Sequence, residues 1–144
     1  MNRTLTDQEA YNELAFYTLA HALEDRSFIH QYVVDAYAAS HADEKSKPIY
    51  VAFALAGLYL HLEKGYTGRQ VQLAHGALAR HKERLPRFDL PEERPPFTIQ
   101  QVLQAPPGAQ RDRAIDEWQR SVWQIWKNEH DRVAEWIKSE LGVP

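Results

Sequence analysis

The stretch PIYVAFALAGLYLHLEK, residues 48–64, decides the fold of this chain. Pro48 suits the first turn of a helix, and Gly65, directly after the stretch, suits its end. The predicted helix is apolar on every side, so every side has to be covered. We therefore expect it to be either the central element of a helical bundle or part of a dimer interface.

Length and composition narrow the possible functions. The chain has 144 residues, enough for one domain with a sizeable core, so we expect residues 1–144 to form a single helical domain. It has no cysteine, which excludes disulfides, thiolate zinc sites and thiol chemistry. Its formal net charge of -3 does not indicate a surface that binds nucleic acid. No apolar run is long enough for a membrane span, and Asp7, Glu9 and Glu13 interrupt any signal-peptide pattern, so we expect a cytoplasmic protein.

The rest of the chain also reads as helix, with no strand-like alternation, so the predicted fold class is all-α. We expect a compact bundle of four main helices plus a proline-rich strap and a long, tryptophan-rich C-terminal helix. The first helix begins at Thr6, which forms a capping box with Glu9. The predicted bounds of the first, second and fourth helices are Thr6 to about Glu24, Asp25 or Arg26 to His41, and Thr67 or Gly68 to about Leu85.

The C-terminal half is divided by its prolines. Residues 86–97 contain four of them, which favours an extended strap over helix. A short helix capped by Thr98 should end before Pro106, and a long helix over 110–141 should follow, with a possible bend near 128–130. All four tryptophans lie in this last helix, where their spacing is more typical of core than of a ligand cage. Trp123 is offset from its neighbours around the helix and is expected to meet a second surface.

Histidines from three helices are predicted to reach one end of the bundle. Short connections make consecutive helices neighbours, which brings His21, His30 and His61 to a similar level. Three imidazoles and an open position suit a divalent metal such as zinc, iron, manganese or nickel. No local metal-binding motif supports this site. The alternative is that these histidines are satisfied amphipathic residues, with Asp35 hydrogen-bonded at a helix interface.

Two other patterns have plain explanations. The basic cluster RHKERLPR, residues 80–87, lies where a helix should end, and cations there complement the helix dipole better than they indicate a phosphate site. The turn GYTGRQVQ has too few glycines to cradle phosphates.

A metal-free histidine and aspartate pair could act in acid–base catalysis, but no nucleophile is obvious beside it.

Several tracts together resemble an uncharacterised bacterial family that carries only a domain-of-unknown-function label. They are FIHQYVVDAYAASH (28–41), FALAGLYLHLEKGYTGRQVQ (53–72), PRFDLPEER (86–94) and SVWQIWKNEHDRVAEW (121–136). The family pattern H-Q-x-x-V-D-x-Y-x-x-x-H is matched by His30, Gln31, Val34, Asp35, Tyr37 and His41, and W-x-x-x-H-x-x-V by Trp126, His130 and Val133. Many relatives begin with a cysteine-bearing segment that is absent here. The resemblance implies no activity, but it suggests a polar site of His30, Asp35, His41 and His130.

Two functions from different classes follow from these patterns. The first is a non-enzymatic interaction or scaffold protein that forms a homodimer through the helix at 48–64 and the tryptophan-rich last helix. The alternative is a bundle that binds a divalent metal or a small polar ligand at its histidines. A hydrolase or transferase role is expected only if a metal is present.

Overall fold

The computed structural model describes residues 5–20 and 29–144, and all regular structure in them is helical. Seven α-helices and two 3-10 turns follow one another: α1 (Asp7–Ala20), α2 (His30–Ser40), α3 (Pro48–Lys64), α4 (Gly68–Ala79), η1 (Lys82–Arg84), α5 (Ile99–Gln104), α6 (Ala109–Ile125), η2 (Lys127–Glu129) and α7 (His130–Leu141). The predicted all-α class is confirmed. None of the helices is long and apolar enough to cross a membrane, as far as the described residues go.

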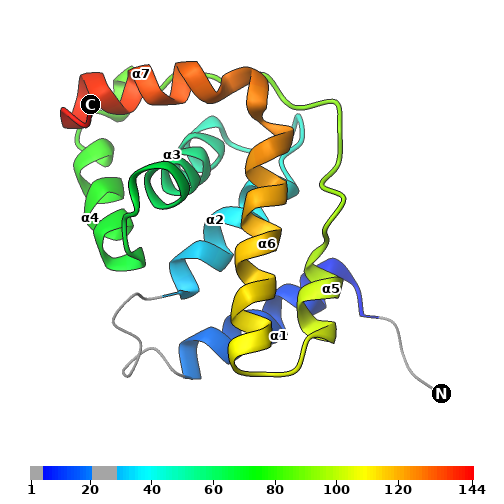
Figure 1. The fold of residues 1–144 in the computed structure, drawn as a ribbon. Helices are drawn as coiled ribbons and strands as arrows, with labels where there is room; N and C mark the ends of the chain where they lie inside the picture. Colours follow the sequence, from blue (N-terminus) through cyan, green and yellow to red (C-terminus); the bar gives the residue numbers. More distant parts are fainter. Residues whose placement is uncertain (1–4, 21–28) are drawn as a thin grey trace.

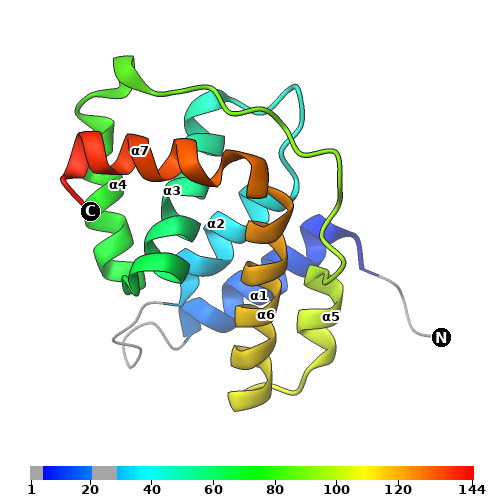
Figure 2. The ribbon, with the colours of Figure 1, turned by 45° about the horizontal axis from the view of Figure 1, so that its top comes forward.

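Helix α3 is the centre of the fold, and its cover comes from within the chain. It packs against α2, α4, α6 and α7, which enclose it in Figures 1 and 2. Almost every residue between Val51 and Leu60 is buried, on all sides of the helix. The first of the two expected roles for this stretch, the central element, is therefore the one observed.

Local signals placed several helix ends correctly. The amide of Glu9 donates to the Thr6 hydroxyl at 3.1 Å, and the Glu9 carboxylate accepts from the Thr6 amide at 3.0 Å, which is the predicted capping box. Thr67 and Thr98 form the same reciprocal pair with the residue three positions on. Gly65 ends α3 with φ 72°, a left-handed conformation in which glycine has no steric penalty.

Other predicted boundaries need correction. Helix α4 ends at Ala79, not near Leu85, and a short 3-10 turn follows it. The expected long C-terminal helix is two helices, α6 and α7, which meet at a corner formed by η2 (Figure 1). The bend lies at the predicted place but is much sharper than expected, because polar Lys127, Asn128 and Glu129 give the apolar stripe no continuation there. The predicted end of the first helix near Glu24 and start of the second near Asp25 lie outside the described residues.

Between η1 and α5 the chain runs extended across the surface, as its prolines predict (Figure 2). We call residues 86–97 the strap. The Arg132 guanidinium donates to the carbonyl of Arg87 at 2.8 Å and lies 5.2 Å from the Phe88 ring, while the amide of Phe97 donates to Ser121 Oγ at 3.2 Å. The strap is thus fixed at both ends, against α7 and against α6.

Candidate functional site

Asp35 is the most unusual of the predicted site residues. It lies on α2, is only 4 % exposed, and accepts a hydrogen bond from Gln31 Nε2 at 3.1 Å. Its carboxylate faces α3 at Gly57, where no side chain occupies the space. Burial raises the pKa of Asp35 well above its ordinary value of 3.8, although the bond from Gln31 acts in the opposite direction. The surroundings of this acid favour its protonated form.

His41 lies at the C-terminal end of α2 and joins it to α1. Its Nε2 donates to Asp7 Oδ2 at 2.8 Å, and its Nδ1 lies 2.7 Å from Ser40 Oγ. The bond from His41, followed by one from Gln100, lowers the pKa of Asp7 below 3.8. The carboxylate of Asp7 therefore accepts from both neighbours.

Sequence reasoning missed Ser40 and Asp7 as partners of His41. The signal for Ser40 was its position next to that histidine, whereas Asp7 is distant in sequence and only the packing of α1 on α2 brings it near. An imidazole between a carboxylate and a hydroxyl has the same order of groups as the triads that activate a serine. Ser40 lies in the last turn of a helix, however, where carbonyl oxygens and the negative end of the dipole oppose a developing oxyanion. The geometry therefore favours a structural role for the hydroxyl.

Two of the three histidines predicted to share a metal, His30 and His61, have separate partners. His30 Nδ1 lies 2.9 Å from Thr18 Oγ1, and His61 Nδ1 donates to the carbonyl of Tyr66 at 2.8 Å while its ring stacks on Tyr32. Burial lowers the pKa of both histidines below the ordinary 6.5. His21 lies outside the described residues, so the three-histidine site stays a prediction. Within the described ranges, no three His, Asp or Glu side chains are grouped to hold a metal ion.

His130 and Trp123 contact each other inside the fold. The two rings stack at 3.8 Å, and His130 Nε2 donates to the carbonyl of Trp123 at 2.8 Å. The indole nitrogen of Trp123 donates to Glu63 at 3.0 Å, and the side chain is 5 % exposed. Trp123 thus packs between α3 and α7, where a second surface would have to displace its present neighbours. His130 has no described contact with Asp35 or His41.

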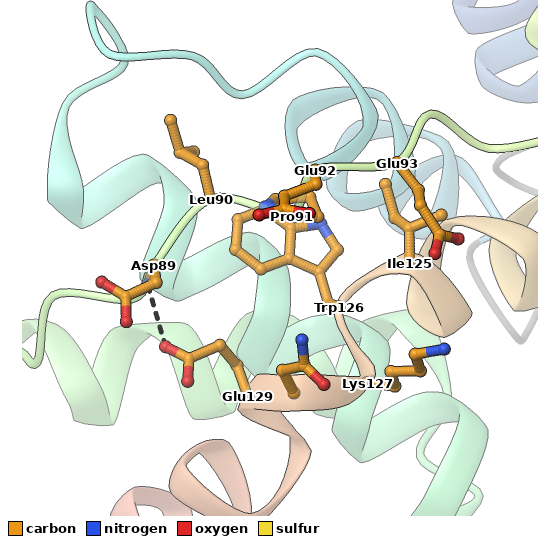
Figure 3. Close-up of a pocket in the computed structure, with 10 residues that line it drawn as sticks. Asp89, Leu90, Pro91, Glu92, Glu93, Ile125, Trp126, Lys127 and Glu129 are labelled. Carbon is orange, nitrogen blue, oxygen red and sulfur yellow. Dashed lines mark hydrogen bonds between the residues drawn. The ribbon is translucent and has the colours of Figure 1, made fainter.

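A cavity with polar walls lies elsewhere, beneath the strap. It has a volume of about 410 Å³, and we call it the strap pocket. Figure 3 shows the strap along one side of it, the corner between α6 and α7 along the other, and the indole of Trp126 between them. The residues that line it are Asp89, Leu90, Pro91, Glu92, Glu93, Ile125, Trp126, Lys127, Asn128 and Glu129.

The strap pocket has firm walls. Trp126 Nε1 donates to the carbonyl of Ala39 at 3.1 Å, which fixes the indole against the end of α2. Buried Glu129 accepts from the amide of Asp89 at 2.8 Å, the bond drawn in Figure 3, and forms an ion pair with Arg132. These bonds hold the strap at a fixed distance from the corner.

Most of the charged side chains that line the strap pocket are negative. Asp89, Glu92 and Glu93 line the strap pocket in addition to paired Glu129, against one cation, Lys127. A second cavity of about 140 Å³ shares Glu92 and Glu93 and continues to the end of α2. Two helices, α2 and α6, have their C-terminal ends here, with partial negative charge, whereas α7 begins directly after Glu129 and brings the partial positive charge of one N-terminal end. Sequence reasoning missed the pocket because the local sequence PRFDLPEER does not determine which helices the strap packs against.

Comparison with protein families agrees with the resemblance seen in the sequence. A model for a family of unknown function, DUF5946, matches residues 6–127. The chain belongs to DUF5946. The match spans α1 to α6 and therefore includes Asp35, His41 and the strap, whereas His130 lies beyond its end. No curated protein and no solved structure matches the chain.

Proposed function

We propose that this member of DUF5946 is a non-enzymatic binding protein that takes a small organic cation in the strap pocket. The observation that carries the proposal is a walled cavity of about 410 Å³ lined by carboxylates of the strap and by the C-terminal end of α6. Its volume falls in the range of small-molecule sites, roughly 300 to 1,000 Å³. Carboxylates and helix C-termini both favour a positive charge.

An amine fits these walls better than a divalent metal ion. The carboxylates are distributed along the strap, and within the described residues they form no group that could hold a metal. An extended amine can meet well-separated carboxylates with several N–H donors and lay its methylene chain along Leu90 and Pro91. A linear polyamine is therefore the class of ligand that the pocket suits.

The predicted metal site and its hydrolase or transferase role remain an alternative proposal for His21, His30 and His61. It is tested by elemental analysis of protein purified without an affinity tag or chelator, beside the variant His30→Ala. Near-stoichiometric metal that is lost in the variant would favour this alternative over amine binding.

Self-association through α3 and the last helices, also expected, has less support than binding in the pocket. The apolar faces that motivated it are covered by the chain's own helices, and Trp123 is among the buried side chains. A second copy would therefore need a different surface.

The proposal is tested with spermidine as the probe. We expect calorimetry at low salt to detect saturable binding, accompanied by a change in tryptophan fluorescence because Trp126 lies in the pocket wall. The double variant Glu92→Gln, Glu93→Gln should weaken binding about tenfold or more, or at least about 1.4 kcal/mol. The absence of binding at millimolar spermidine would refute the proposal.

A matched control separates a site from general charge attraction. Glu117 and Glu135 are exposed acids on α6 and α7 that do not line the pocket. Their double change to Gln removes the same formal charge and should leave spermidine affinity within about twofold of the wild type, because neither carboxylate lines the cavity that holds the ligand. Equal weakening by the two pairs would show diffuse attraction without a site.

A further inference from the structure

The middle of the strap is held only through its ends. The hydrogen bonds that tie the strap to the helices involve Arg87, Asp89 and Phe97. Residues 90–96, which lie between these bonds, make no hydrogen bond, ion pair or ring contact with any other described part of the chain. Three of them are prolines, which have a fixed φ and no backbone N–H to donate. This segment can therefore move as a stiff piece without breaking a bond.

Empty space adjoins the same segment. Both the strap pocket and the cavity of about 140 Å³ at the end of α2 are lined by Leu90, Pro91, Glu92 and Glu93. Leu90 is 41 % exposed, and the two glutamates are exposed as well. A segment with few buried contacts and no backbone bonds costs little free energy to displace. The cavities beside the strap leave room for such a movement.

Side chains of opposite charge lie on the two walls of the strap pocket. Glu93 lines it from the strap, and Lys127 lines it from the corner between α6 and α7. In Figure 3, Glu93 extends from the strap toward the corner, on the side of Trp126 where Lys127 lies. No ion pair joins them in this structure, and neither has another charged partner among the residues described. A small movement of the strap toward the corner would bring the two charges into contact.

We propose that the strap closes over its pocket through an ion pair between Glu93 and Lys127, and that a cationic ligand has to replace this pair. This regulation rests on the amine binding proposed above. In the closed form the ammonium of Lys127 takes the place of a ligand amine beside the strap carboxylates. Lys127 is then a competitor built into the same chain.

Such a competitor affects which ligands bind. A monoamine exchanges one ion pair for another and gains little. A ligand with several amines reaches further carboxylates of the strap pocket, such as Asp89, in addition to the one that Lys127 gives up. The closed strap therefore favours polyamines over single amines.

Zero-length cross-linking of the free protein tests the closed strap. A carbodiimide joins a carboxylate to an amine only when the two groups are in contact. The wild type should give a cross-link between Glu93 and Lys127, identified by peptide mass spectrometry, and Glu93→Gln should lose it. Glu92→Gln is the matched control and should keep the cross-link, because successive side chains of an extended chain point to opposite sides. A wild type without the cross-link, or equal loss in both variants, would overturn the proposal.

Spermidine titrations at low salt test the competition. Lys127→Gln should bind spermidine about two- to fivefold more tightly than the wild type, the range that an exposed ion pair supports. Lys127→Arg keeps the cation and should bind like the wild type. Arg94→Gln removes a cation that lines the neighbouring cavity but not the strap pocket, and it should change the affinity less than Lys127→Gln does.

The two experiments separate the closed strap from amine binding. Equal gains in affinity from Lys127→Gln and Arg94→Gln would show general repulsion and overturn the competition, as would an unchanged affinity in Lys127→Gln. A cross-link in the free protein together with no spermidine binding by any variant would refute amine binding, and the competition with it, whereas the closed strap would stand.

Discussion

The carboxylate of Asp35 on α2 lies against the backbone of Gly57 on α3, so closely that a Cβ atom on the glycine would be 1.9 Å from Asp35 Oδ2. No other residue type fits at position 57 while the acid stays where it is. This contact sets how closely the two central helices approach each other. It also puts a buried acid next to the most apolar helix of the fold.

Replacing Gly57 by alanine should therefore destabilise the protein. An added methyl group in a mid-helix position usually stabilises by about 1 kcal/mol, but the clash with a buried side chain should outweigh this and give a net loss of about 1 to 3 kcal/mol. Urea unfolding measures the difference. Gly76→Ala is the control, since nothing lies within 4 Å of a Cβ atom there, and it should stabilise the protein by up to about 1 kcal/mol.

Asp35→Asn should stabilise the protein increasingly as the pH rises. Because burial raises the folded-state pKa of Asp35, the folded state retains a proton that the unfolded state loses above its ordinary pKa of 3.8. The stability of the wild type therefore falls as the pH rises from 3.8 through the raised pKa, and the asparagine variant lacks this fall. At neutral pH the gain should be about 1 to 3 kcal/mol. Unfolding curves from pH 4 to 8 that stay parallel for both proteins would contradict the expectation.

The buried histidines should make the fold sensitive to acid. Burial lowers the folded-state pKa of His30, His61 and His75, so the unfolded state takes up protons first as the pH falls below 6.5. Stability should be full above 6.5 and decrease through the window down to the lowered pKa values. In His75→Gln the amide can still donate to the carbonyl of Phe53, as Nε2 does at 2.8 Å. Thermal unfolding between pH 7.5 and 5 should show a flatter pH dependence for this variant.

Glu129→Ala should release one end of the strap. The change leaves the amide of Asp89 and the guanidinium of Arg132 without a shared acceptor, which should lower stability by about 1.5 to 3 kcal/mol. Trypsin should then cut faster after Arg87, because the segment around it is less firmly held. Glu117→Ala, an exposed change on α6, should leave the cleavage rate as in the wild type.

The predictable parts of this fold are those encoded by neighbouring residues. Thr6 and Glu9, three positions apart in the sequence, cap a helix. The prolines of residues 86–97 prevent a regular helix there, whatever surface the strap packs on. The rotation of one helix against another is not encoded locally. Connection lengths predict that His21 and His30 lie at one level, but level alone does not decide which partner an imidazole meets, and His30 pairs with Thr18.

The candidate site is harder to predict than the helices for the same reason. Asp35 lies at a helix interface, as expected, yet its contact with Gly57 depends on the distance between two helices. The strap pocket depends on a surface path of twelve residues and on the sharpness of the corner after Ile125, where the sequence predicts only a possible bend. The tryptophans lie in the core as expected, because Trp118 and Trp123 on α6 and Trp136 on α7 belong to the buried faces of their own helices.

The bond from the Trp126 indole to the Ala39 carbonyl has a consequence for how the chain is made. It joins residues 87 positions apart, so the end of α2 stays without this partner until α6 has been synthesised. Helix α3 likewise stays partly uncovered until α6 and α7 have been synthesised, because both helices pack against it. On the ribosome the most apolar helix therefore emerges well before the helices that enclose it. During that interval the nascent chain depends on chaperones or on speed to avoid aggregation.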